Sequence, residues 1–167
     1  MIKQNLSVTL LALCMSATIW GQADEKKCIF ISTSHLDTQW NWTARTTLEE
    51  YIPNTMTQNF PLFEKYPDFH FNFEAAIHYM WMKEYYPAQY EEMKKYIREG
   101  RWHISGASWD ANDVLVPSTE SVIRNIMLGQ EYYRQEFGVE STDIFLPDCF
   151  GFGWTLPTIA AHCGFIG

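Results

Sequence analysis

The chain has 167 residues, of which 47% are apolar and 16% aromatic, so it can bury a hydrophobic core. Its formal charge is −8, and no block of five or more Lys and Arg residues occurs. Proteins that bind nucleic acid need a basic surface to meet the phosphates, so this composition argues against nucleic acid as a partner.

The first 23 residues are typical of a secretory signal peptide. A positively charged start is followed by an apolar run over 6–19 and by a small-residue cleavage site at 21–23. A membrane anchor is the alternative, but the run is shorter than the roughly 20 apolar residues that a span needs. Cys14 is a weak sign of a lipoprotein signal, because a bulky leucine precedes it. We therefore expect residues 24–167 to form a secreted or periplasmic chain without a membrane span.

Short apolar runs alternate with helical patterns through the rest of the sequence. The runs predict strands over 28–34, 69–73, 101–105 and 143–146, with a fifth strand beginning at 164. Apolar residues at helical spacing predict helices over 44–65, 76–99, 118–137 and 155–163. Pro53 should kink or divide the first helix, and Pro87 should begin a new segment of the second. Ser118 and Gly138 should cap the third.

Strands that are each followed by a helix predict βα units and a parallel sheet. A complete βα barrel takes about 250 residues, whereas the residues after the predicted signal peptide hold only some five strands. We therefore expect an incomplete α/β barrel and a chain that is part of a longer protein.

Three cysteines follow the predicted signal peptide: Cys28, Cys149 and Cys163. Their odd number and wide spacing argue against a disulfide framework, and the absence of a C-x-x-C pair argues against a zinc ribbon or redox motif. We expect Cys28 and Cys163 to be small core residues.

Polar side chains follow three of the predicted strands at the edge where parallel sheets carry their functional groups. They are His35, Asp37, Trp40 and Trp42 after the first strand, Trp109, Asp110 and Asp113 after the third, and Asp148 after the fourth. In an extended segment His35 and Asp37 point the same way, so an imidazole and carboxylates could share zinc or a similar divalent ion. The alternatives are a hydrogen-bonded histidine and two aspartates that cap turns, since H-x-D is short and common.

Trp40, Trp42 and Trp109 lie beside these carboxylates in the sequence. Acids that act on a glycosidic bond, next to flat apolar faces for the ring, are what a sugar site requires. The sequence therefore favours a carbohydrate as the ligand.

Three ordered segments resemble the N-terminal part of the catalytic domain of glycoside hydrolase family 38, the retaining alpha-mannosidases. They are "HLDTQW" at 35–40, "SGASWDANDVLVPSTESVIRNIMLGQEYYRQEFG" at 105–138 and "LPDCFGFGWTLPTIAAHCG" at 146–164. The resemblance covers residues 28–167 and implies an incomplete parallel (β/α)7 barrel of the glycoside hydrolase and deacetylase type, truncated after about five strands.

The same resemblance implies site roles. His35, Asp37 and Asp148 would hold a divalent metal, with zinc the expected ion, and Asp148 would also be the catalytic nucleophile. Trp40 would line the sugar subsite, and Asp113 falls on a motif position at the substrate site without an assigned role. The substrate would be a mannose-containing oligosaccharide or glycan, hydrolysed at its alpha-mannosidic bond with retention.

The family also needs a second histidine ligand and a general acid/base, and no residue here matches either motif. We expect both further along the chain, so the 167-residue chain should not hydrolyse a nitrophenyl alpha-mannoside by itself. Two rival functions stay open: a metal-dependent carbohydrate deacetylase and a non-catalytic carbohydrate-binding module.

Overall fold

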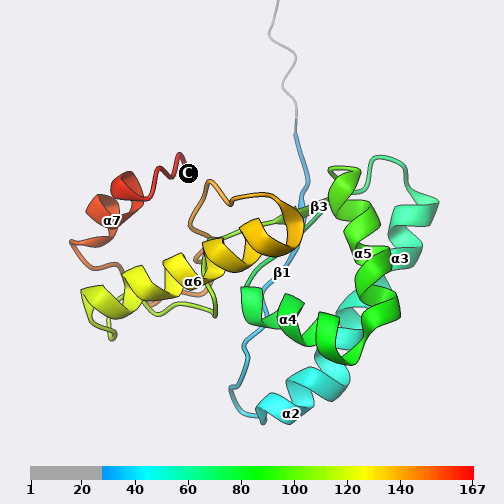
Figure 1. The fold of residues 1–167 in the computed structure, drawn as a ribbon, viewed down its shortest axis with the longest axis horizontal. Coiled ribbons are helices and arrows are strands. Elements are labelled where there is room, and N and C mark those ends of the chain that lie inside the picture. Colours follow the sequence, from blue (N-terminus) through cyan, green and yellow to red (C-terminus); the bar gives the residue numbers. More distant parts are fainter. Residues whose placement is uncertain (1–27) are drawn as a thin grey trace, which may run out of the picture. The chain divides into compact units, whose positions relative to one another are not determined.

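The computed structural model of the protein describes residues 28–167, and the predicted signal peptide lies outside them. Figure 1 shows the elements in chain order. They are β1 (Ser32–Ser34), α2 (Ala44–Thr46), the π-helical turn η1 (Thr47–Tyr51), α3 (Ile52–Lys65), β2 (Phe71–Phe73), α4 (Ala76–Tyr85), α5 (Pro87–Arg98), β3 (Trp102–Ile104), α6 (Thr119–Phe137) and α7 (Leu156–His162). Among these elements, no helix has the length and apolar character that crossing a membrane requires.

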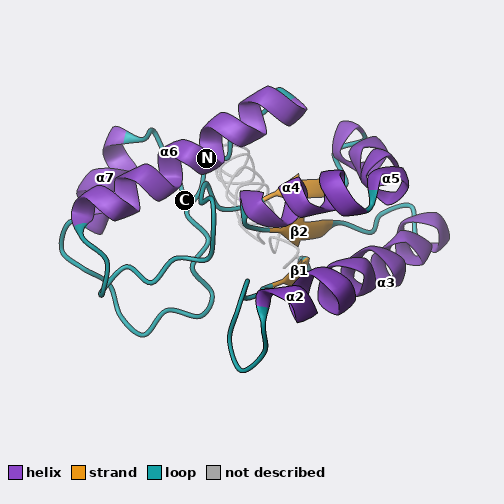
Figure 2. Ribbon diagram, turned by 60° about the horizontal axis from the view of Figure 1, so that its bottom comes forward, coloured by secondary structure: helices purple, strands orange, loops and turns teal. Residues whose placement is uncertain are grey.

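The three strands form a parallel sheet in the order β1-β2-β3 (Figure 2). Alternation along the strands separates its two faces. Phe71, Phe73 and Trp102 are buried, whereas Asn72 and His103, which are paired in the register, are more exposed. The predicted α/β organisation with parallel strands is confirmed, while the seven-stranded barrel stays a prediction.

The buried face of the sheet packs against α3, α4 and α5 through a layer of aromatic rings. Phe63 stacks on Tyr96 with ring centroids 4.2 Å apart. The indole N–H of Trp102 donates to the Tyr79 hydroxyl at 3.0 Å, and this hydroxyl donates to the Phe73 carbonyl at 2.9 Å. Large rings bury much apolar area, and these two bonds satisfy the polar atoms buried with them. The layer therefore fixes the strands against the helices.

Helix α6 has the two ends that the sequence predicts. The hydroxyl of Ser118 accepts a hydrogen bond from the Ser121 N–H at 3.2 Å, which caps the first turn. Gly138 ends the helix in a left-handed conformation with φ of 68°. Pro87 begins α5, also as predicted.

The segment predicted as the first helix, 44–65, is divided just before Pro53 into α2, η1 and α3. Pro53 lies in the first turn of α3, directly after the π-helical turn, in which the Ile52 N–H bonds to the Thr47 carbonyl. Proline has no N–H to donate, so the first turn of a helix is the position that accepts it.

Two predicted strands, at 143–146 and from 164 onward, are not strands in the described part of the chain. The carboxylate of Asp143 accepts a hydrogen bond from the Ser105 hydroxyl at 2.9 Å and from the Gly106 N–H at 3.3 Å. Toward β3, the segment 143–146 is thus bonded through a side chain and not through a main-chain ladder. The segments 143–146 and 164–167 meet through the main chain at two points, from the Ile166 N–H to the Thr142 carbonyl at 2.8 Å and from the Ile144 N–H to the Gly167 carbonyl at 3.1 Å, and neither segment forms a strand.

The expectation of buried cysteines was wrong for both residues concerned. Cys28 and Cys163 are exposed and free. Cys28 precedes Ser32, at which the pairing of β1 with β2 begins, and its neighbours Ile29 and Phe30 are exposed as well. Cys163 follows the last turn of α7 on its exposed side.

Helix α6 holds the loop after β3 through a contact that requires glycine. Gly129 lies against the backbone of residues 107–109, and a Cβ at this position would come within 2.1 Å of the Ala107 carbonyl oxygen. One turn earlier, the amide of Asn125 accepts from the Asp110 N–H at 3.0 Å and donates to the Asp110 carbonyl at 3.0 Å. These contacts fix the loop that leads into the pocket described below.

We expect Gly129→Ala to lower the free energy of unfolding by at least about 2 kcal/mol, because helix and loop must separate to admit the methyl group. Urea unfolding followed by circular dichroism measures the change. The matched control is Met127→Ala on the exposed side of the same helix, where the side chain is 64% exposed and a change within about 0.5 kcal/mol is expected. Equal stabilities of the two variants would contradict the packing argument.

Candidate active site

The strand register places His35 beside Glu74. Ser34 is paired with Phe73, so the residues that follow them leave the sheet together at its carboxyl edge. His35 Nδ1 forms a hydrogen bond and ion pair with a carboxylate oxygen of Glu74. The Glu74 side chain is only 6% exposed, against 27% for His35. A buried carboxylate thus holds one nitrogen of the imidazole.

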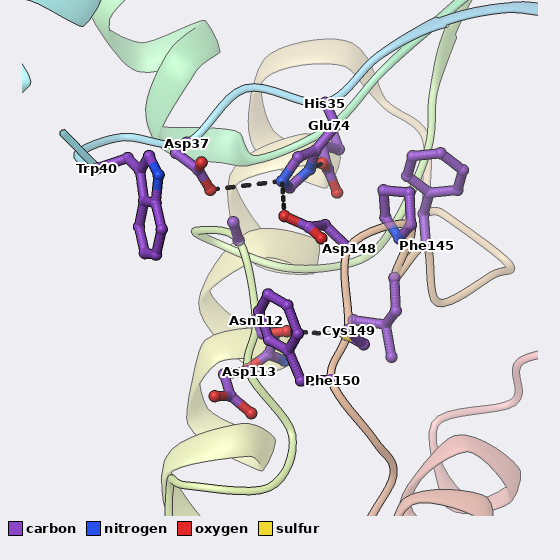
Figure 3. Close-up of a pocket in the computed structure, with 13 residues that line it drawn as sticks. His35, Asp37, Trp40, Glu74, Asn112, Asp113, Phe145, Asp148, Cys149 and Phe150 are labelled. Carbon is purple, nitrogen blue, oxygen red and sulfur yellow. Dashed lines mark hydrogen bonds and ion pairs between the residues drawn. The ribbon is translucent and has the colours of Figure 1, made fainter. Parts of the chain in front are cut away.

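The other ring nitrogen faces two further carboxylates. His35 Nε2 lies 3.4 Å from Asp37 Oδ1 and 4.0 Å from Asp148 Oδ2, and Figure 3 shows both acids on the same side of the ring. The structure therefore brings together all three residues that the sequence assigned to a metal. Asp148 lies in a turn and not at the end of a strand, since the segment 143–146 before it is not a strand.

These side chains line a cavity of about 300 Å³, at the lower end of the range for small-molecule sites. Trp40, 65% exposed, and Asp113 line the same cavity. Asp113 Oδ1 also accepts a hydrogen bond from the Leu115 N–H at 2.9 Å, which shapes the loop around it.

The other two tryptophans considered for a sugar site do not line this cavity. The indole of Trp42 donates to the Thr47 hydroxyl at 2.7 Å. Trp109 packs edge-on against Tyr132, with centroids 5.9 Å apart. These contacts give both tryptophans structural roles. Their adjacency to carboxylates in the sequence did not predict the direction of their side chains.

Glu74 is the site residue that the sequence analysis missed. It directly follows the second predicted strand, at 69–73, just as His35 follows the first. The rule that polar residues at the carboxyl ends of parallel strands gather in one place therefore applies to it as well.

A buried polar network lies next to this site. The Thr38 hydroxyl donates to Asp110 Oδ1 at 2.5 Å and lies 3.2 Å from Nε2 of the buried His78. His78 Nδ1 is 3.3 Å from the Glu74 carbonyl oxygen. The network joins the loop after β1, which carries His35 and Asp37, to helix α4 and to the loop after β3, which carries Asp113.

Burial and charge shift the pKa values of three of these groups. The hydrogen bond to Glu74, aided by nearby carboxylates, raises the pKa of His35. Burial raises the pKa of Glu74. Burial lowers the pKa of His78 to about 4, so this histidine is neutral at physiological pH.

The donor set suits zinc or a similar divalent ion: one imidazole nitrogen and two carboxylates. A histidine ligand usually gives its second N–H to a carboxylate, which is the contact that Glu74 makes with His35. Two ligands about 2.1 Å from a tetrahedral zinc ion lie about 3.4 Å apart, so the Asp37 spacing matches and the Asp148 spacing is longer. Within residues 28–167, no group of three His, Cys, Asp or Glu side chains is already arranged closely enough to hold an ion.

Comparisons with known proteins agree with one another. The family model described as "Glycosyl hydrolases family 38 N-terminal domain" matches residues 25–167. Alpha-mannosidase G of Dictyostelium discoideum is 37% identical over 130 residues, which are 78% of this chain and 12% of that protein. Alpha-mannosidase 2C1 of Homo sapiens is 32% identical, with the same coverage of each chain.

Among solved structures, the crystal structure of an alpha-mannosidase from Enterococcus faecalis V583 superposes with a TM-score of 0.70 at 25% identity. The match covers 81% of this chain and 15% of that one. This chain therefore spans about an eighth of the length of the curated relatives that it matches.

The lowered pKa of His78 predicts acid sensitivity of the fold. The folded protein favours the neutral ring of His78. The free energy of unfolding is therefore highest above pH 6.5, the ordinary pKa of histidine, and it falls as the pH decreases toward about 4. The loss would be on the order of 3 kcal/mol. We expect His78→Gln, which keeps an amide near the Nε2 position, to flatten the pH dependence of the unfolding free energy over this range. His162→Gln, at an exposed position of α7, is the control, and a wild-type slope in His78→Gln would contradict the assignment.

Proposed function

The chain belongs to glycosyl hydrolase family 38, and on that premise we propose that it forms part of the active site of an enzyme that hydrolyses alpha-mannosidic bonds in oligosaccharides or glycans. The observation that carries this proposal is the convergence of Asp37 and Asp148 on Nε2 of His35 at the carboxyl edge of the sheet. The named relatives are alpha-mannosidases, which supports the choice of mannose as the sugar.

We assign the nucleophile to Asp148. Its side chain is 60% exposed, so a sugar in the cavity can reach the carboxylate. In a retaining reaction the carboxylate attacks the anomeric carbon, a general acid protonates the leaving oxygen, and water later hydrolyses the glycosyl ester. We assign the general acid to neither Glu74 nor Asp113, because Glu74 is bound to His35 and Asp113 accepts a backbone N–H.

A divalent ion, with zinc the first choice, would be held by His35, Asp37 and Asp148. When bound, it would supply positive charge that favours ionised carboxylates and attracts sugar hydroxyls. The exposed ring of Trp40 offers a flat apolar face beside these groups, on which a sugar ring can stack. Together the ring and the carboxylates would orient one mannose unit in the cavity.

We expect Asp148→Asn to lower kcat at least about a thousandfold in an active form of the protein that contains residues 28–167, because an amide is a poor nucleophile. In the wild type, a fluorinated mannoside should label Asp148, as peptide mass spectrometry would show. Asp68→Asn, in an exposed turn, is the control and should keep full activity. An unlabelled Asp148 in an enzyme that removes acetyl groups from sugars would favour the deacetylase alternative.

The metal assignment predicts that His35→Ala weakens zinc binding at least about tenfold, because the nitrogen that residues 28–167 contribute to the donor set is lost. Competition with a chromophoric chelator measures the affinity in the same form of the protein. His162→Ala, which removes a histidine outside the cavity, should bind zinc as the wild type does. Equal affinities of wild type and His35→Ala would place the metal elsewhere.

A further inference from the structure

We propose that Glu74 is a positioning residue that holds the imidazole of His35 in the tautomer whose free Nε2 faces Asp37 and Asp148. Glu74 lies outside the three segments that carry the family resemblance. The inference deepens the proposed function and rests on it, because a free nitrogen matters most if a metal binds there.

The first support is the hydrogen bond itself. When Glu74 is ionised its carboxylate can only accept, so the proton of this bond is then on Nδ1 of His35. A neutral imidazole carries one ring proton, which leaves the lone pair of Nε2 directed at Asp37 and Asp148. Without Glu74, these two carboxylates would draw the proton to Nε2, and a protonated nitrogen cannot bind a metal.

The second support is burial. Glu74 is 6% exposed at its side chain, and among residues 28–167 its only side-chain hydrogen-bond partner is His35. Burial of a carboxylate is costly unless the charge is paired. A glutamate that is buried with a single partner, at the edge of the candidate site, is therefore better explained by its effect on that partner than by packing.

The third support is the rigidity of the backbone around Glu74. The next residue, Ala75, has φ of 68°, a conformation that residues other than glycine seldom adopt. The N–H groups of Ala76 and Ile77 donate to the carbonyls of Ser108 at 3.1 Å and Trp109 at 2.9 Å. Such a conformation persists only where the surroundings hold it. The carboxylate of Glu74 is thus presented from a fixed point.

The experiment compares wild type with Glu74→Leu, which removes the acceptor with little change in volume, and with Glu74→Gln, whose amide oxygen can still accept from Nδ1–H. Glu84→Leu, on the exposed side of α4, is the matched control. The first readout is long-range proton–nitrogen NMR of the metal-free 167-residue chain with labelled histidine, at an alkaline pH where the ring is neutral. A His35→Gln sample assigns the resonance of His35.

We expect the proton of His35 on Nδ1 in the wild type, Glu84→Leu and Glu74→Gln, and a shift toward Nε2 in Glu74→Leu. A structural role alone would not move this signal. The second readout is zinc affinity by chelator competition in the active form of the protein, where Glu74→Leu should bind about 10- to 100-fold more weakly and Glu74→Gln should recover most of the loss.

An unchanged tautomer in Glu74→Leu would overturn the proposal, as would a wild-type ring with its proton on Nε2. If Glu74→Leu does not fold, as judged by circular dichroism, Glu74→Asp takes its place, because its shorter side chain withdraws the carboxylate from Nδ1. A wild-type protein that binds no zinc would contradict the metal of the proposed function, while the NMR result would still decide the role of Glu74.

Discussion

The parallel pairing of β1 with β2 is the constraint on which the candidate site depends. Because Ser34 is opposite Phe73, the next residue of each strand, His35 and Glu74, reaches the same edge of the sheet and the two side chains meet. A slip of one residue would turn every side chain of a strand to the opposite face. The aromatic layer that fixes Phe73 against the helices therefore also fixes the direction of the imidazole.

The candidate catalytic residues lie on loops, and contacts with the helices of the fold fix the position of the loop after β3. Helix α6 contacts the loop after β3 through Gly129 and Asn125, and this loop in turn accepts the first N–H groups of α4. Thr38, next to Asp37, is tied to the same loop through Asp110. Loops on a rigid scaffold are the usual place for binding and catalysis, and here the scaffold reaches the loops through backbone contacts and buried polar bonds.

Charge balance links the acids of the cavity to the proposed cation. The lining contains the carboxylates of Asp37, Glu74, Asp113 and Asp148 but neither Lys nor Arg. Like charges in one site raise each other's free energy unless a positive charge compensates them. In the metal-free protein the group of the lining that can supply this charge is the imidazole of His35, whose pKa is raised by the hydrogen bond to Glu74 and by the nearby carboxylates. A bound divalent ion would supply this positive charge in place of a proton on Nε2 of His35.

The sequence by itself determined the parallel βα organisation, the ends of α6 and the place of His35 and Asp37 after β1, because periodicity, caps and strand ends are local properties of the chain. Asp148 meets them from a turn and not from the predicted strand, and this approach was visible only in the tertiary structure. The sequence predicted a strand over 143–146 that the structure lacks. The Asp143 carboxylate bonds there to Ser105, and a contact between such distant segments cannot be read from a local pattern. Nor did the sequence identify Glu74, although its place after a predicted strand was visible. Only the tertiary structure decided that this carboxylate meets His35, because a side-chain direction follows from strand register and packing, which no local pattern specifies.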